Sequence, residues 1–214
     1  YSQRKQVWQF TQWLSKNGYL GSTLGSGGNV SFFDRDEEVI FITPSGKPYH
    51  EMSNEDICII NTNMQQLSGK LSPSIESTMN VGVYLKRPTV NAVVHTHQPY
   101  ASVFALINKP IPALFDEVTL ALGARVEIIP YALSGSAELV ANVTKQLSNG
   151  ASCYILQNHG ALSLGRNLSQ AVLNAETLEK VCQVYYHALC TGEPINRLPE
   201  SAIQHWLKTR TRGS

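Results

Sequence analysis

The run Val-Asn-Ala-Val-Val-His-Thr-His at residues 90–97 gives the clearest evidence of the architecture of this chain. Its apolar first part is typical of a buried strand, and the strand ends in His95 and His97. Since side chains alternate across a strand, both imidazoles point to the same side, within reach of one metal ion. A His-x-His pair can also do no more than satisfy local polar groups, so a metal site needs further ligands.

A third histidine follows another apolar run further along the chain. Residues 153–157 read as a short strand, and His159 comes soon after it, followed by Gly160, where a second segment of backbone can approach closely. Three neutral imidazoles leave a tetrahedral ion one open position, which is typical of catalytic sites and not of closed structural ones. The remaining histidines lack a partner at ligand spacing and are interpreted as ordinary residues: His50, His187 and His205.

Outward from these runs, segments with strand-like and helix-like patterns alternate along the chain. An amphipathic helix closed by Gly18 precedes a strand pair, and the last element is a long helix that begins near Ser169 and ends at Gly192. This order predicts an α/β domain in which helices cover a sheet. The expected strands are 29–33, 39–42, 57–60, 90–95, 125–129 and 153–157, and the expected helices between them are 75–86, 100–107 and 137–147, the last capped by Ser134 or Ser136.

Composition restricts the class of protein. The 214 residues are 43% hydrophobic and 15% charged, which suits one domain spanning residues 1–214 with a substantial core. Lys and Arg number 17 against 16 for Asp and Glu, so neither nucleic acid nor a membrane surface is an expected partner. The four cysteines form no CxxC pair, and we expect free thiols in a cytoplasmic protein.

Two further features are candidates for chemistry beside a metal. Glu76 lies at the expected start of a helix, where a carboxylate can act as a general base, although it can also simply complement the helix dipole. The glycine-rich loop at residues 25–29 and the turn at Ser45 and Gly46 can present backbone amides to an anion. Such a loop is also common as a purely structural turn.

Five short motifs, taken together, carry a resemblance to a known family. In order along the chain they are Gly27-Gly28-Asn29-Val30-Ser31, Thr43-Pro44-Ser45-Gly46, Pro73-Ser74-Ile75-Glu76, Val94-His95-Thr96-His97 and Asn158-His159-Gly160. Their order and spacing resemble the class II aldolase/adducin family over nearly the whole chain. The resemblance implies a three-layer α/β/α sandwich around a central, mainly antiparallel sheet, and a homotetramer. It also implies one divalent ion per chain, zinc by ligand type, with manganese, cobalt and iron as alternatives.

The resemblance also implies roles for individual residues. His95, His97 and His159 match the metal ligands, and Glu76 matches the acid/base glutamate. The positions that hold a substrate phosphate correspond to Asn29, Ser45, Gly46 and Ser74, with Ser26 as a neighbouring candidate. The implied reaction is the retro-aldol cleavage of a ketose 1-phosphate to dihydroxyacetone phosphate and an aldehyde.

Two departures from the aldolase pattern leave other reactions open. Ile75 stands where a second phosphate-binding serine is expected, and Asp116 with Glu117 stands where a tyrosine acts near the aldehyde half. Asp116 is therefore a second catalytic candidate, acting from a neighbouring subunit, or else part of a solvated loop or helix cap. The alternatives are a metal-dependent decarboxylase, epimerase or dehydratase acting on a hydroxy-carbonyl compound. A non-enzymatic adducin-like scaffold would not need the three histidines and Glu76 together.

Overall fold

The computed structural model describes residues 2–212 and shows a sheet of nine strands in the order β4-β3-β2-β1-β5-β9-β8-β7-β6. Strands β7 and β8 run parallel, and the other neighbouring strands pair antiparallel. The strands are β1 Asn29–Asp34, β2 Val39–Ile42, β3 Cys58–Ile60, β4 Gln66–Ser68, β5 Ala92–Thr96, β6 Ile111–Pro112, β7 Arg125–Ile129, β8 Cys153–Leu156 and β9 Gly160–Gly165.

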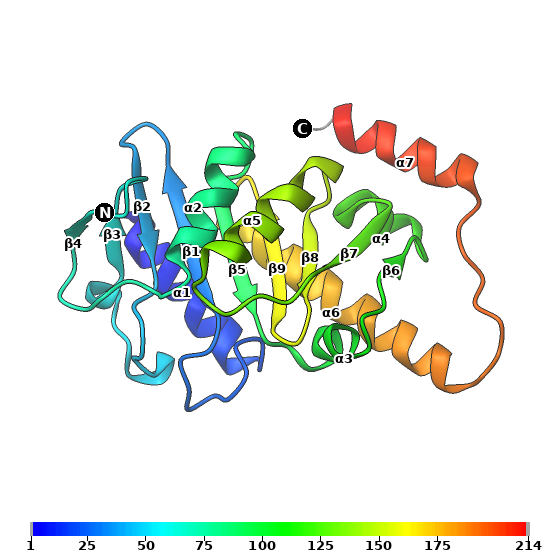
Figure 1. Cartoon of the computed structure of the whole chain (residues 1–214), viewed down its shortest axis with the longest axis horizontal. Coiled ribbons are helices and arrows are strands. Elements are labelled where there is room, and N and C mark those ends of the chain that lie inside the picture. The colour runs from blue at the N-terminus through cyan, green and yellow to red at the C-terminus, as the bar shows by residue number, and fades with distance from the viewer. Residues whose placement is uncertain (1, 213–214) are drawn as a thin grey trace.

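Helices cover both faces of this sheet, so the chain has the three layers expected of it. Figure 1 shows α2 and α5 in front of the sheet and α1 and α6 behind it. The helices are α1 Ser2–Lys16, α2 Ser77–Lys86, α3 Pro99–Ile107, α4 Asp116–Leu122, α5 Ala137–Gln146, α6 Leu168–Cys190 and α7 Glu200–Arg212. The predicted α/β/α sandwich around a mainly antiparallel sheet is confirmed.

The alternation of side chains along β5 assigns its residues to different layers. Val93 packs in the core between the sheet and α2 and α5, whereas Ala92 and Val94 pack in the core beneath α1 and α6. All five residues of β5 are buried, because the strand lies at the middle of the sheet with a helical layer on each side. The strand therefore provides a rigid support for the histidines at its end.

The structure corrects several expected elements. Helix α2 begins at Ser77 and not at residue 75, and Ile75 is exposed before the helix instead of joining its buried stripe. Strand β9 is missing from the prediction because its sequence, Gly-Ala-Leu-Ser-Leu-Gly, lacks β-branched residues. Strands β4 and β6 and helices α4 and α7 were not predicted either. Of the two candidate caps of α5, Ser136 accepts the hydrogen bond from the Leu139 amide.

Two findings bear on the class of protein. No helix within residues 2–212 is long and apolar enough to cross a bilayer. All four cysteines are free thiols, of which Cys190 is exposed and the other three are buried.

Candidate metal centre

The three histidines of the sequence prediction meet at one end of the sheet. His95 lies in β5, His97 follows that strand, and His159 lies in the turn between β8 and β9. The Nε2 atom of His95 is 3.2 Å from the Nε2 atom of His97 and 3.2 Å from that of His159. The ligand atoms of all three lie within 4.8 Å of one another. Antiparallel pairing of β5 with β9 brings the turn containing His159 back beside the end of β5.

The hydrogen bonding of His95 shows that this arrangement fits a cation. Its Nδ1 atom is 2.9 Å from the carbonyl oxygen of Ala161, so in the neutral ring Nδ1 carries the proton and Nε2 presents a lone pair. That lone pair faces two further imidazole nitrogens, which is unfavourable unless a cation lies among them. Tetrahedral zinc with bonds of about 2.0–2.1 Å to nitrogen would separate its ligands by about 3.3 Å, close to the observed spacing.

Gly160 permits this close approach. An added Cβ at Gly160 would lie 2.3 Å from the carbonyl oxygen of Thr96 and 2.6 Å from the ring of His97. An added Cβ at Gly28 would lie 2.4 Å from the carbonyl oxygen of His95. These two glycines let the β9 turn and the start of β1 pack directly against the histidine-bearing backbone.

Glu76 lies beside the histidines. Its Oε2 atom is 3.1 Å from Nε2 of His95, and its Oε1 atom is 3.3 Å from Nε2 of His159. It is the N-cap residue of α2, but its side chain makes no capping hydrogen bond and turns toward the imidazoles. Asn29 donates to Oε2 at 3.2 Å, and Ser134 donates to Oε1 at 2.6 Å. The carboxylate is thus fixed at the histidine cluster instead of serving the helix end.

The site favours a negative carboxylate at Glu76 and neutral imidazoles at His97 and His159. Burial raises the pKa of Glu76, but hydrogen bonding and charge interaction with His95, together with Ser134 and His159, outweigh it and lower the pKa to about 2. Burial, reinforced by His95 and His159, lowers the pKa of His97 to about 3. Burial and His95 lower the pKa of His159 as well. At neutral pH, Glu76 is therefore ionised, and His97 and His159 can act as ligands.

A turn next to Glu76 offers donors to an anion. The segments around Pro44 and Pro73 pair, since the Ser45 amide donates to Ser72 at 2.9 Å and the Ser74 amide donates to Thr43 at 3.1 Å. Gly46 follows in a left-handed conformation with φ 72°. Among the described residues, nothing accepts a hydrogen bond from the Gly46 amide or the Ser45 hydroxyl. These groups remain available to a ligand.

The sequence comparisons agree with this geometry. Residues 6–186 match the family described as the Class II Aldolase and Adducin N-terminal domain. The chain belongs to the class II aldolase/adducin family. It is similar to a 5-deoxy-D-ribulose 1-phosphate aldolase of Bacillus thuringiensis serovar kurstaki, with 35% identity over 195 residues, covering 88% of this chain and 87% of the relative.

Two further relatives support the same membership of the class II aldolase/adducin family. An L-fuculose phosphate aldolase of Methanococcus maripaludis is 36% identical over 163 residues, covering 76% of this chain and 86% of that one. A solved structure of an L-fuculose 1-phosphate aldolase superposes with a TM-score of 0.90 at 29% identity, covering 98% of this chain and 96% of that chain. Class II aldolases use a divalent metal, and the group of His95, His97 and His159 could bind one.

The other predicted residues of this family member lie at different distances from the histidines. Asn29 contacts Glu76 directly, and Ser74 accepts a hydrogen bond from the Glu76 amide at 3.3 Å. Ser26 lies in the half-buried loop before β1, where its carbonyl oxygen is 3.5 Å from the Tyr49 hydroxyl. Asp116 is exposed at the start of α4 and accepts a hydrogen bond from Trp206 of α7 at 2.6 Å. Within the described chain it makes no contact with the three histidines.

Sequence reasoning missed two residues that position Glu76. Ser134 was considered only as a helix cap, yet two serines precede α5 and only one can cap it. Asn80 donates to Asn29 at 2.7 Å and to Ser31 at 3.1 Å, and is fully buried. The sequence contained one signal for this contact, because Asn80 is a polar residue one helical turn after Glu76, on a face of α2 that also carries buried apolar residues.

Proposed function

We propose that this chain is a divalent-metal-dependent aldolase that cleaves a ketose 1-phosphate into dihydroxyacetone phosphate and an aldehyde. The observation that carries the proposal is the carboxylate of Glu76, held within 3.1 and 3.3 Å of two of the three converging histidines. Relatives that are 35% and 36% identical are named as aldolases of sugar phosphates. A metal-binding cluster with an adjacent base suits proton transfer next to a carbonyl group.

In this proposal His95, His97 and His159 hold the ion. The bound ion would supply Lewis-acid polarisation of the ketose carbonyl. The bond between His95 and the Ala161 carbonyl keeps the imidazole in the tautomer that presents Nε2. Zinc is the proposed metal because three imidazoles suit its preferred ligands and tetrahedral geometry.

Glu76 is the proposed acid/base residue. In the direction of condensation its carboxylate accepts the proton from the hydroxymethyl carbon of dihydroxyacetone phosphate, and in cleavage it returns that proton to the same carbon. Asn29 and Ser134 hold one carboxylate oxygen each, so the group is positioned before substrate arrives. Asn80 in turn holds Asn29 in place by donating a hydrogen bond to its side-chain oxygen.

The substrate phosphate is proposed to bind at the paired turns. The Ser45 hydroxyl and Gly46 amide are the donors, with Ser74, Asn29 and Ser26 around them. The family pattern has a serine where this chain has Ile75, whose side chain is 66% exposed. The phosphate therefore relies on the turn at Ser45 and Gly46 more than on the segment before α2.

The remaining proposals concern the assembly. We propose a single-domain protein that forms a homotetramer in the cytoplasm. Asp116 has no contact with the histidines of its own chain, so its proposed catalytic role, near the aldehyde half of the substrate, requires that it act in the site of a neighbouring subunit. Its exposure and its position at the start of α4 are compatible with such a contact.

The test is an assay of zinc-reconstituted protein against a panel that includes 5-deoxy-D-ribulose 1-phosphate and L-fuculose 1-phosphate. Released dihydroxyacetone phosphate is coupled to a reductase, and chelated protein and Glu76→Gln serve as controls. Release that both controls abolish is the expected result. No release from protein shown to hold one metal per chain would overturn the aldolase proposal and direct the search to decarboxylation or epimerisation.

A further inference from the structure

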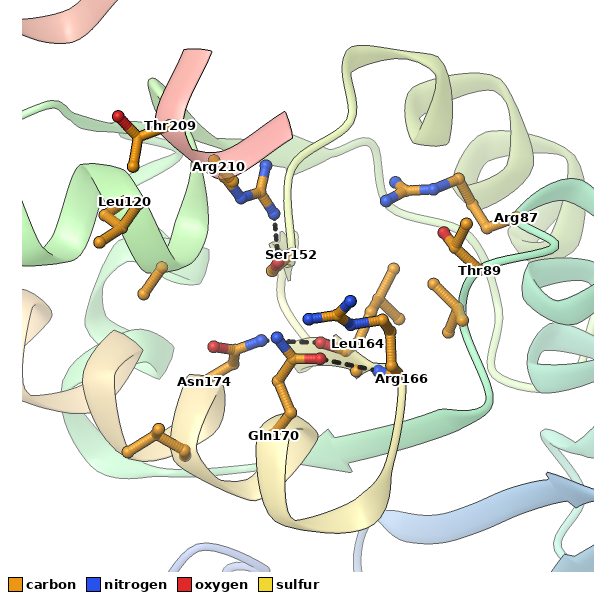
Figure 2. A pocket seen from close by; sticks show the side chains of 14 residues that line it. Arg87, Thr89, Leu120, Ser152, Leu164, Arg166, Gln170, Asn174, Thr209 and Arg210 are labelled. Atoms are coloured by element: carbon orange, nitrogen blue, oxygen red, sulfur yellow. Dashed lines mark hydrogen bonds between the residues drawn. The ribbon is translucent and has the colours of Figure 1, made fainter. Parts of the chain in front are cut away.

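A cavity of about 420 Å³ lies at the end of the sheet opposite the histidines. Its walls come from the segment after α2, the turn between β9 and α6, the start of β8, and helices α4, α6 and α7. Figure 2 shows three arginine side chains entering it from different elements. They are Arg87, Arg166 and Arg210, and we call this space the arginine cavity.

The charged side chains among the described residues that line the arginine cavity are all positive. Among the described residues that line it, three are arginine and none is Asp or Glu. The other polar side chains are hydroxyl and amide groups: Thr89, Ser152, Gln170, Asn174 and Thr209. Guanidinium groups are always protonated, so the described lining residues place three positive charges around one space and no carboxylate among them. Such a lining favours the binding of an anion.

Two of the arginines are held in place by the protein backbone. Arg87 donates from Nη1 to the carbonyl oxygens of Leu147 and Ala151, each at 3.3 Å. Arg210 donates to the Gly150 carbonyl at 2.7 Å and also to the hydroxyl of Ser152. These four acceptors are uncharged oxygens, and the bonds hold both heads beside the cavity. Burial and the charge of Arg87 together lower the pKa of Arg210.

Arg166 differs from these two. Its backbone amide donates to Gln170 at 2.9 Å, but within residues 2–212 nothing accepts a hydrogen bond from its guanidinium. Figure 2 shows that guanidinium above Gln170 and Asn174, facing the side of the cavity where Ser152 lies. Arg166 can therefore close on a ligand without first giving up a protein contact.

The arginine cavity is a separate place from the metal centre. In the β5–β9 ladder, Thr96 pairs with Ala161 at the histidine end and Ala92 pairs with Gly165 at the other. Arg166 follows Gly165, five residues from Ala161, which corresponds to about 16 Å along an extended strand. One small substrate cannot occupy both sites.

We propose that the arginine cavity binds the anionic phosphate of a small phosphate monoester. A planar guanidinium can bind two oxygens of one phosphate, and two or three such groups match a dianion better than a single carboxylate. The volume exceeds what inorganic phosphate fills, and the hydroxyl and amide groups of the lining suit a hydroxylated carbon skeleton. Part of the wall, Thr209 and Arg210, lies beyond residues 6–186 that match the family.

Calorimetric titration of the metal-reconstituted protein tests the proposal, with inorganic phosphate and glycerol 3-phosphate as probes at constant ionic strength. The decisive variant is Arg166→Gln, since it removes a charge without breaking a protein hydrogen bond. Arg197→Gln is the matched control, because it removes the same charge from an exposed segment outside the cavity. Ser45→Ala separates this binding from phosphate held at the metal centre.

Arg166→Gln should weaken glycerol 3-phosphate binding about 10-fold or more, as expected for a lost charge-assisted hydrogen bond, and Arg197→Gln should change it less than about twofold. Ser45→Ala should leave this component of binding intact. Equal affinities of Arg166→Gln and Arg197→Gln, displacement by chloride at equal concentration, or no binding would overturn the proposal. Tighter binding of inorganic phosphate than of glycerol 3-phosphate would overturn the proposal that the ligand is a phosphate monoester. Because no aldol cleavage is measured, the result does not depend on the proposed function.

Discussion

The two ends of the β5–β9 ladder present opposite electrostatic problems. At one end, three imidazole nitrogens and a carboxylate converge, with separations of 3.1 to 3.3 Å between neighbouring atoms. At the other end, three guanidinium groups face a cavity of about 420 Å³. The first arrangement calls for a cation and the second for an anion.

The two ends also differ in how firmly their groups are held. His95 is fully buried in a central strand, and both oxygens of Glu76 have donors. In the arginine cavity Arg166 is exposed. The comparison indicates that the metal centre is built for fixed geometry and the arginine cavity for adaptable binding. Variants at the metal centre should therefore have large effects on activity.

The largest effect is expected from removing the ligand at the centre of the cluster. In His95→Ala, metal content should fall from about one ion per chain to nearly none, because His95 contacts both other imidazoles. Activity should fall about 10³-fold or more, as expected when several kcal/mol of transition-state stabilisation are lost. Metal analysis and the coupled assay measure both effects. The exposed His187→Ala is the control, and retention of metal by His95→Ala would contradict the assignment.

Glu76→Gln should reduce kcat about 10²- to 10⁴-fold while the ion stays bound. The amide keeps the size of the side chain but cannot accept the transferred proton. Steady-state kinetics and metal analysis on the same sample measure the two quantities. Loss of the ion together with activity would show that Glu76 mainly supports metal binding. Glu193→Gln is the matched control, because Glu193 is exposed and the substitution removes the same charge.

A smaller effect is expected when one support of Glu76 is removed. Ser134→Ala deletes the donor 2.6 Å from Oε1 and should lower kcat about 10-fold, since a hydrogen bond to a charged group is worth about 1.5 to 3 kcal/mol. KM should change little, because the hydroxyl does not hold the substrate phosphate. Ser134→Thr should restore most of the rate. Equal losses in both variants would argue against a positioning role.

The metal-free protein should lose stability as the pH falls from about 6.5 to about 3. The pKa of His97 is lowered to about 3 in the folded chain, so the unfolded chain binds its proton first and unfolding is favoured across this window. Glu76, with its pKa lowered to about 2, should add a further loss below about pH 4.5. Denaturant titrations at several pH values measure the slope. In His97→Gln the free energy of unfolding should depend less on pH above pH 4.5. An unchanged slope would contradict the lowered pKa of His97.

The metal centre could be predicted from the sequence because its determinants are local. His95 lies near the end of one strand and His97 directly follows that strand, and Gly160 directly follows His159, so the motifs reveal both the ligands and the close packing. Glu76 could be placed near a helix start, but its exact contacts depend on α2 beginning at Ser77. Its partner Ser134 lies 58 residues further along the chain, and no local pattern indicated that contact.

The arginine cavity could not be predicted for the same reason. Arg87, Arg166 and Arg210 are separated by long stretches of chain and meet only because α6 and α7 pack at that end of the sheet. Strand β9, which links the two ends, was not predicted either. It is a strand because it pairs with β5 on one side and β8 on the other, and its sequence has little strand propensity of its own. Contacts that depend on tertiary packing could not be predicted from the periodicity of the sequence.

Gly160 also matters for how related sequences are interpreted. Alanine at this position would place a methyl carbon against the Thr96 carbonyl and the His97 ring, although every metal ligand would still be present in the gene. A sequence search that checks only the three histidines would then count such a descendant as a metalloenzyme. Within this fold, the three histidines alone therefore do not identify a metal site, and residue 160 has to be checked as well.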